Sequence, residues 1–169
     1  EEAPRGVDYA LNLARPHVEG SRILVYFSDN ITTIEITDAV AAFRASDSPP
    51  GCALVGRNVE EPERFGVAVF DGEGNLKDIV EKPEVPPSNF AIGGIYLFDE
   101  TFWERLDRVV AELGDKMSIS DINRTYVLEG EASIIESENS LWIDCGTPDA
   151  LLEASQLAAD GKLSPEPSN

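Results

Sequence analysis

Positive charge is scarce in this sequence. Its 169 residues carry 13 Lys and Arg against 32 Asp and Glu, which gives a formal net charge of −19. Proteins that bind nucleic acid through its phosphates need a basic surface, so the composition argues against nucleic acid as a partner. A protein this acidic would need a bound cation wherever it handles phosphate groups.

Cysteine and long apolar runs are scarce as well. Cys52 and Cys145 lie far apart and form no C-x-x-C pair, so we expect neither a disulfide framework nor a zinc site, and a reducing cytoplasm as the compartment. The apolar runs fall well short of the ~20 residues of a membrane-spanning helix, and the opening EEAPRG is unlike a signal peptide. We therefore expect no membrane partner, and we expect that residues precede this opening.

What the sequence does contain is the periodicity of a single α/β domain over residues 1–160, with a flexible tail at 161–169. Helical spacing of apolar residues predicts helices over 7–14, 36–43, 102–113, 119–128 and 150–160, the first ended by Pro16. Apolar runs predict strands over 23–27, 52–59, 90–98, 131–137 and 140–146, a loop at 46–51 and a hairpin around 71–74. The early alternation of helix and strand is typical of parallel βαβ units. We expect a mixed, mainly parallel, Rossmann-like sheet flanked by helices.

Two carboxylates follow predicted strands. Asp29 ends the run RILVYFSDN, and Asp144 lies in LWIDCGT. Ligands of open α/β sheets bind beyond the carboxyl ends of the strands, and two hard oxygen ligands converging there would suit Mg²⁺, with water and phosphate completing its shell. Each aspartate taken alone also fits a turn residue or a helix cap.

Glu81-Lys82-Pro83 closes the second strand of the hairpin. Pro83 stops strand pairing there and favours an extended backbone at Lys82. Lys82 would then reach a phosphate as a point charge, and Glu81 would accept hydrogen bonds from sugar hydroxyls. A solvated ion pair at the end of a strand is the alternative.

Glycines interrupt two of the predicted strands. Gly66 and the pair Gly93-Gly94 stand where glycine is usually costly. They mark either a bulge or the close approach of a ligand to the backbone. Ser28 and Ser118 have no histidine near them in sequence, so the residues offer no argument for a nucleophile.

Taken together in order, these stretches resemble a known family. They are PRGVDYA, FSDN, ERFGVAVF, EKP, PSNFAIGGIY, SDINRTY and WIDCGTPDALLEAS. The series is similar to the sugar-phosphate nucleotidyltransferases, and most closely to the glucose-1-phosphate thymidylyltransferases. Each stretch alone is weakly specific, whereas their unbroken order from about residue 3 to residue 160 is strong.

The resemblance implies roles for individual residues. Asp29 and Asp144 match the family's Mg²⁺ ligands, and Lys82 matches a position that lines its sugar-phosphate pocket. Gly6 and Val7 match the stretch that lies against the nucleotide base. The remaining matches belong to the sugar-phosphate pocket: Gly66, Glu81, Ile92 and Tyr96, with Trp142 shaping the end beside the second aspartate.

The implied reaction is nucleotidyl transfer in the synthesis of nucleotide sugars for polysaccharides. An oxygen of a sugar-1-phosphate, here glucose-1-phosphate, attacks the α-phosphate of a nucleoside triphosphate, here dTTP, and pyrophosphate leaves. Such chemistry depends on positioning and charge neutralisation by Mg²⁺ and cations rather than on a covalent nucleophile. Relatives that use uridine share most of these motifs, so base and sugar stay open. The family is commonly oligomeric, which makes a homo-oligomer a further expectation.

The chain departs from the family pattern at three places. The Gly-rich loop G-x-G-T-R, which wraps the triphosphate, has no counterpart here, so we expect the latter part of an enzyme with little activity alone. Ser28 replaces a Gly before the metal aspartate. GDKMSISD stands where the family has R-G-E-L-E-I-T-D, so an Arg is lost and Ser118 replaces a Glu.

Two other classes of function remain open. One is a non-catalytic domain that binds a sugar nucleotide or a partner subunit, which the missing loop favours. The other is an acidic signalling domain with Asp29 as phosphoacceptor, which the long β region from 52 to 98 fits poorly. Retention of Asp29, Lys82 and Asp144 favours the transferase, because a domain that only binds needs no pair of metal ligands.

Overall fold

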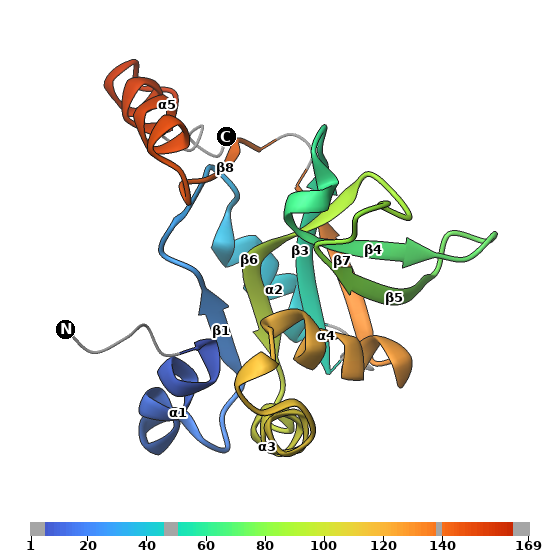
Figure 1. Ribbon diagram of the computed structural model, residues 1–169. Coiled ribbons are helices and arrows are strands. Elements are labelled where there is room, and N and C mark those ends of the chain that lie inside the picture. The colour runs from blue at the N-terminus through green and yellow to red at the C-terminus, as the bar shows by residue number, and fades with distance from the viewer. Residues whose placement is uncertain (1–5, 46–50, 138–139, 164–169) are drawn as a thin grey trace.

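The computed structural model describes residues 6–45, 51–137 and 140–163 (Figure 1). The helices are α1 (Val7–Val18), α2 (Ile36–Ala45), α3 (Phe102–Leu113), α4 (Ile119–Leu128) and α5 (Pro148–Ala159), with 3-10 turns η1 (Pro62–Arg64) and η2 (Gly114–Lys116). The strands are β1 (Ile23–Tyr26), β2 (Asn30–Thr32), β3 (Cys52–Asn58), β4 (Gly66–Phe70), β5 (Leu76–Glu81), β6 (Phe90–Phe98), β7 (Ala132–Glu136) and β8 (Trp142–Asp144). The predicted loop at 46–51 and tail at 161–169 fall largely on residues 46–50 and 164–169, outside the described residues.

Strand β6 organises the larger sheet, and all nine of its residues are buried. β3 runs antiparallel along one edge of β6. On the other edge β4 pairs with the first half of β6, with Gly66 opposite Ile92, and β1 pairs with the second half, with Tyr26 opposite Ile95. The β4–β5 hairpin and β7 extend the sheet outward, and β2 and β8 form a separate two-stranded ribbon.

The expectation of a mainly parallel sheet is wrong. β1 and β3 run in the same direction, but β6 lies between them and is antiparallel to both. Among the described strands, β3 and β7 form the one parallel pair. The mixed sheet flanked by helices is confirmed. The local pattern could not show that a strand from much later in the chain would separate the first two.

Helices cover both faces of this sheet (Figure 1). On one face α3 and α4 pack onto the larger apolar cluster, in which the Phe98 ring lies 4.6 Å from that of Phe102 and 5.6 Å from that of Tyr126. On the other face Phe43 of α2 packs in a smaller cluster with Leu97. Because side chains alternate along a strand, Leu97 and Phe98 face opposite cores.

Local chemistry explains where the helices begin and end. Thr147 caps α5, because its Oγ1 accepts a hydrogen bond from the Ala150 N–H at 3.2 Å. The prediction that Pro16 ends the first helix is wrong, since α1 continues to Val18. Proline removes one backbone donor and clashes mainly with the turn before it, and close to the C-terminus the helix tolerates this loss. Among the described helices, none is both long and apolar enough to cross a bilayer.

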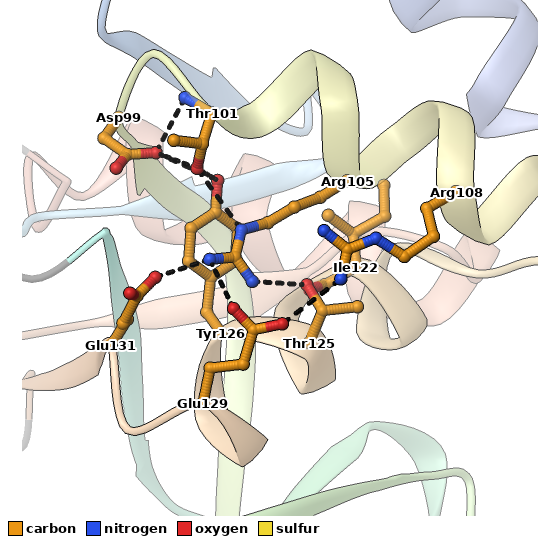
Figure 2. A network of polar contacts seen from close by, with 9 residues as sticks. All are labelled: Asp99, Thr101, Arg105, Arg108, Ile122, Thr125, Tyr126, Glu129 and Glu131. Carbon is orange, nitrogen blue, oxygen red and sulfur yellow. Dashed lines mark hydrogen bonds and ion pairs between the residues drawn. The ribbon is translucent and has the colours of Figure 1, made fainter.

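A buried arginine joins α3, α4 and the start of β7 (Figure 2). The Arg105 side chain is 5% exposed, and its Nη2 forms ion pairs with Glu131 and, at 2.9 Å, with Glu129. Its Nε and Nη1 donate to the hydroxyls of Thr101 and Thr125, each at 3.3 Å. The guanidinium of this α3 residue therefore meets acceptors from the residue that precedes α3, from α4 and from the loop after α4.

The aromatic ring beneath this arginine extends the network. The Arg105 guanidinium lies 3.9 Å from the centroid of the Tyr126 ring, a cation–π distance. The Tyr126 hydroxyl donates to Asp99 at 3.2 Å, and Asp99 also accepts the Thr101 N–H at 3.0 Å before α3 begins. Burial raises the pKa of the Tyr126 hydroxyl above its ordinary value, so the hydroxyl stays protonated as a donor.

Removal of the buried guanidinium should destabilise the fold. Arg105→Ala is expected to lower the free energy of unfolding by about 2–3 kcal/mol, because several charge-assisted hydrogen bonds and the contact with Tyr126 are lost. Arg108→Ala is the matched control, since Arg108 binds the same Glu129 at 3.2 Å but is 59% exposed, and should cost at most about 1 kcal/mol. Equal costs in urea unfolding would contradict a stabilising role for the network.

The large negative charge should make stability depend on salt. Self-repulsion at a net charge of −19 opposes the compact state, and raising the salt concentration to about 1 M shortens the Debye length to roughly 3 Å. We expect the thermal midpoint to rise by at least about 4 °C between low salt and 1 M KCl. A midpoint that does not change across this range in calorimetry would show that repulsion does not limit stability.

Candidate functional site

A cavity of about 240 Å³ lies between the large sheet and the β2–β8 ribbon. Residues from both sheets, from the η1 turn and from α4 line it. It brings together eight of the ten residues predicted for the site: Asp29, Gly66, Glu81, Lys82, Ile92, Tyr96, Trp142 and Asp144. These residues span most of the chain, so the fold gathers them from distant positions.

The two other predicted residues lie outside this cavity. Gly6 is exposed just before α1. Val7 lines a separate, mainly apolar cavity of about 470 Å³ between α1 and β1. Phe27 lines both cavities and lies between them.

The β2–β8 ribbon carries the two aspartates. Asn30 lies opposite Asp144 in its antiparallel register, so Asp29 is one residue away from that pair. The Cys145 N–H donates to the backbone oxygen of Asp29 at 2.7 Å, which ties the two segments together just beyond the pair. The Asp144 carboxylate also accepts the Gly146 N–H at 3.2 Å. Asp29 and Asp144 therefore lie on neighbouring segments of the polypeptide, and both line the same cavity.

Asn30 fixes the orientation of Asp29. Its side chain is buried, with 5% of the residue exposed, and its Oδ1 accepts the Trp142 indole N–H at 2.6 Å and the Gly94 N–H at 3.1 Å. Two donors on one side require the amide oxygen there, so the amide nitrogen faces Asp29 and donates to its Oδ1 at 2.8 Å. One buried amide thus connects a carboxylate, an indole and the central strand.

Glycine in β6 permits this contact. A Cβ on Gly94 would lie 2.6–2.9 Å from the Asn30 amide, closer than non-bonded atoms approach. The sequence predicted either a bulge or the close approach of a ligand at Gly93-Gly94. The β3–β6 register does shift there, between the pairs Leu54–Tyr96 and Gly56–Ile92, as in a bulge. At Gly94 the group that approaches the backbone is a side chain of the same protein.

A serine from α4 holds Glu81. The Ser120 Oγ donates to Glu81 Oε2 at 2.5 Å, and Gly66 lies opposite Glu81 in the β4–β5 register. A Cβ on Gly66 would lie 2.6 Å from that hydroxyl. Glycine at position 66 therefore leaves room for the Ser120–Glu81 hydrogen bond, which fixes the position of one oxygen of the Glu81 carboxylate.

Lys82 has an unusual backbone. Its φ is +43°, a left-handed conformation that costs a residue with a side chain of order 1–3 kcal/mol. The prediction of an extended backbone before Pro83 is therefore wrong. The strand pairing ends at Glu81, and the Lys82 N–H turns to donate to the backbone oxygen of Phe65 at 2.9 Å. The ammonium is 3.9 Å from Glu81, and the side chain is 66% exposed and free to move.

Aromatic side chains form the apolar part of the cavity. Tyr96 is buried, and its ring meets that of Phe27 edge-on at 5.7 Å. Burial, reinforced by nearby carboxylates, raises the pKa of the Tyr96 hydroxyl far above its ordinary value, so it stays neutral. The Trp142 ring lies 5.1 Å from Phe65. These rings form the apolar wall of the cavity, whereas charged groups such as Lys82 stay accessible to water.

Sequence reasoning missed three polar residues of the cavity: Asn30, Arg64 and Ser120. Asn30 had a usable signal, because an amide directly after a buried strand and next to Asp29 needs partners. Arg64 and Ser120 stand in the stretches ERFGVAVF and SDINRTY that carry the resemblance, but the resemblance assigned neither a role, and the fold brings both to the cavity.

The donor set fits a divalent cation that shares its shell with substrate. Asp29 and Asp144 supply two hard oxygen ligands, the number with which proteins commonly hold Mg²⁺ when phosphates and water complete the octahedron. Within residues 6–45, 51–137 and 140–163 there is no group of three or more His, Cys, Asp or Glu that would hold a metal by itself. A cation here would therefore depend on the substrate for its remaining ligands.

The close approach at Gly94 leads to a test of the Asn30 contact. Gly94→Ala should lower the free energy of unfolding by about 1–3 kcal/mol, because the new methyl group must displace the buried amide. Gly93→Ala is the control from the neighbouring position, where a Cβ meets its closest atoms at 3.4 Å, and should cost less than about 1 kcal/mol. If urea unfolding gives the same cost for both variants, the amide is not held as described.

Known proteins match both the sequence and the fold. Residues 1–161 match the profile of the nucleotidyl transferase family. A low-salt glycan biosynthesis nucleotidyltransferase of Haloferax volcanii is 31% identical over 159 residues, which are 94% of this chain and 44% of that protein. A glucose-1-phosphate thymidylyltransferase of Xanthomonas campestris is 32% identical over 93% of this chain and 53% of its own. The chain thus spans about half the length of these curated relatives.

Solved structures agree. A Bacillus anthracis protein assigned as a glucose-1-phosphate thymidylyltransferase, in complex with a sucrose, has a TM-score of 0.83 at 31% identity and is matched over 95% of this chain and 63% of its own. A UDP-glucose pyrophosphorylase with UDP-glucose has a TM-score of 0.79 at 20% identity, over 95% and 64% of the two chains, and shares the fold. With a matching family profile across nearly the whole sequence, the chain belongs to the nucleotidyl transferase family.

Proposed function

We propose that this domain transfers a nucleotidyl group from a nucleoside triphosphate to a sugar-1-phosphate, releasing pyrophosphate. The observation that carries the proposal is the single cavity in which Asp29, Glu81, Lys82 and Asp144 meet. Glucose-1-phosphate and dTTP are the proposed substrates, since the Xanthomonas campestris relative is a glucose-1-phosphate thymidylyltransferase. Because the chain spans about half of such relatives, the proposal concerns the activity of the whole protein.

The proposed roles follow from the chemistry of each group. Asp29 and Asp144 would hold Mg²⁺, which when bound neutralises phosphate charge and aligns the α-phosphate for attack. Lys82 would bind a phosphate oxygen of the sugar-1-phosphate, and its exposed, flexible side chain allows it to follow the substrate. Glu81 would accept hydrogen bonds from sugar hydroxyls with the oxygen that does not bind Ser120.

The other predicted residues would shape the pocket. Gly66 leaves room at its floor, and the apolar surfaces of Ile92 and Tyr96 would lie beneath the sugar. Trp142, held by Asn30, would close the end beside Asp144. Gly6 and Val7 lie outside the cavity, and we retain them as candidates for contact with the nucleotide base.

Positioning would then provide most of the catalysis. The phosphate of the sugar-1-phosphate is already ionised at neutral pH, so its oxygen attacks without a protein base. Asn30 and Ser120 fix the directions of Asp29 and Glu81 before substrate arrives, which lowers the entropy cost of reaching the reactive arrangement. The described free thiols, Cys52 and Cys145, are compatible with the reducing cytoplasm that we propose as the compartment.

The decisive experiment measures pyrophosphate release with Mg²⁺, glucose-1-phosphate and each nucleoside triphosphate in turn. It is run on this chain and on a chimera that adds the N-terminal part of the Xanthomonas campestris relative. We expect activity with dTTP in the chimera. Asp29→Asn and Asp144→Asn should each reduce it by at least about 100-fold, since loss of a metal ligand removes several kcal/mol of charge stabilisation.

Asp38→Asn is the matched control, because Asp38 is an exposed aspartate on α2, and it should leave the rate unchanged. A chimera that binds substrates but releases no pyrophosphate would contradict the transferase and favour a domain that only binds sugar nucleotide. Full activity in either Asp→Asn variant would contradict the assigned metal ligands.

A further inference from the structure

The cavity is lined by more negative than positive side chains, which opposes the binding of an anionic ligand. Three carboxylates line it, those of Asp29, Glu81 and Asp144, while Lys82 and Arg64 are the two cations among the described lining residues. A phosphate monoester would bring up to two further negative charges. Lys82 alone could not offset them, because Glu81 lies 3.9 Å from its ammonium.

The fold places Arg64 beside Lys82. Arg64 ends the η1 turn and lies two residues before Gly66, which pairs with Glu81 in the β4–β5 ladder. The Lys82 N–H donates to the backbone oxygen of Phe65 at 2.9 Å. The two cationic residues therefore flank one end of this ladder on neighbouring segments, and both residues line the cavity.

The guanidinium of Arg64 is available for a ligand. Its Nη1 forms an ion pair with Glu61 at 3.0 Å, three residues earlier, and the two side chains are 44% and 64% exposed. Exposed pairs of this kind are weak. A guanidinium carries five N–H donors, so most of its donors remain for a second anion or for exchange of partner.

We infer that Arg64 is a phosphate-binding residue of this cavity, which grips the phosphate of a sugar-1-phosphate together with Lys82. The inference rests on the proposed function and adds a residue to it. The planar guanidinium would bind two phosphate oxygens at once and set the orientation of the group, whereas Lys82 supplies a point charge. Glu61 holds Arg64 when the phosphate is absent and competes with it when the phosphate is present.

Titration calorimetry with glucose-1-phosphate tests this assignment on the full chain. Arg64→Gln should weaken binding by about tenfold, because charge-assisted hydrogen bonds are lost. Arg64→Lys should weaken binding less, since the positive charge is kept and only the ability of the guanidinium to bind two phosphate oxygens at once is lost. Glu61→Gln should tighten binding by removing the competing carboxylate. Arg44→Gln, which removes an equal charge from an exposed position on α2, should leave binding unchanged.

The outcomes separate this inference from the proposed function. If the wild-type chain binds and Arg64→Gln binds equally well, the assignment of Arg64 is wrong while the sugar-phosphate site stands. If the folded wild-type chain does not bind glucose-1-phosphate, the assignment of Arg64 in this cavity is overturned, whereas pyrophosphate release by the chimera decides the proposed function separately. A loss as large in Arg44→Gln would indicate a general charge effect and overturn the specific role. Circular dichroism of each variant checks folding, which an exposed substitution should preserve.

Discussion

The arrangement of the candidate site depends on one buried amide. Asn30 accepts hydrogen bonds from the Trp142 indole and the Gly94 backbone, and donates to Asp29. Turning the amide over would leave two buried donors without an acceptor, at a cost of about 1–3 kcal/mol each. The interior of the protein therefore sets the direction of a carboxylate at its surface. The β2–β8 ribbon is tied to β6 by the same contacts.

Most elements of the fold could be predicted from the sequence, and the pairing of strands could not. The buried run at 90–98 and the hairpin around 71–74 correspond to structure because each depends on local chemistry. The expected parallel pairing of the first two strands failed, because β6 separates them. Direction and neighbour in a sheet are decided by packing over the whole chain, which short-range periodicity does not record.

The candidate site was predictable where a motif marked it. Eight residues singled out in the sequence line one cavity, although their roles remain proposals. Lys82 was predicted in the right place with the wrong backbone, because its N–H donates to the backbone oxygen of Phe65, a partner from another segment that the local preference before Pro83 does not include. Arg64 and Ser120 stand in two stretches that carry the resemblance, ERFGVAVF and SDINRTY, but the strand register and a helix from another part of the chain were needed to show that they reach the cavity.

Burial differs sharply on the two sides of the cavity. β6 is buried throughout, whereas the residues of β8 are half-buried and Ala154 is the one buried residue of α5. Local opening in proteins follows such differences, so amide hydrogens of β8 and α5 should exchange with solvent before those of β6. Asp144 thus lies on β8, which opens more easily. Asp29, in contrast, is held through Asn30 to Gly94 of the central strand β6. A ligand that bridges the two aspartates and binds only the closed form raises the opening free energy of β8 by RT ln(1 + L/Kd), where L is its concentration and Kd its dissociation constant.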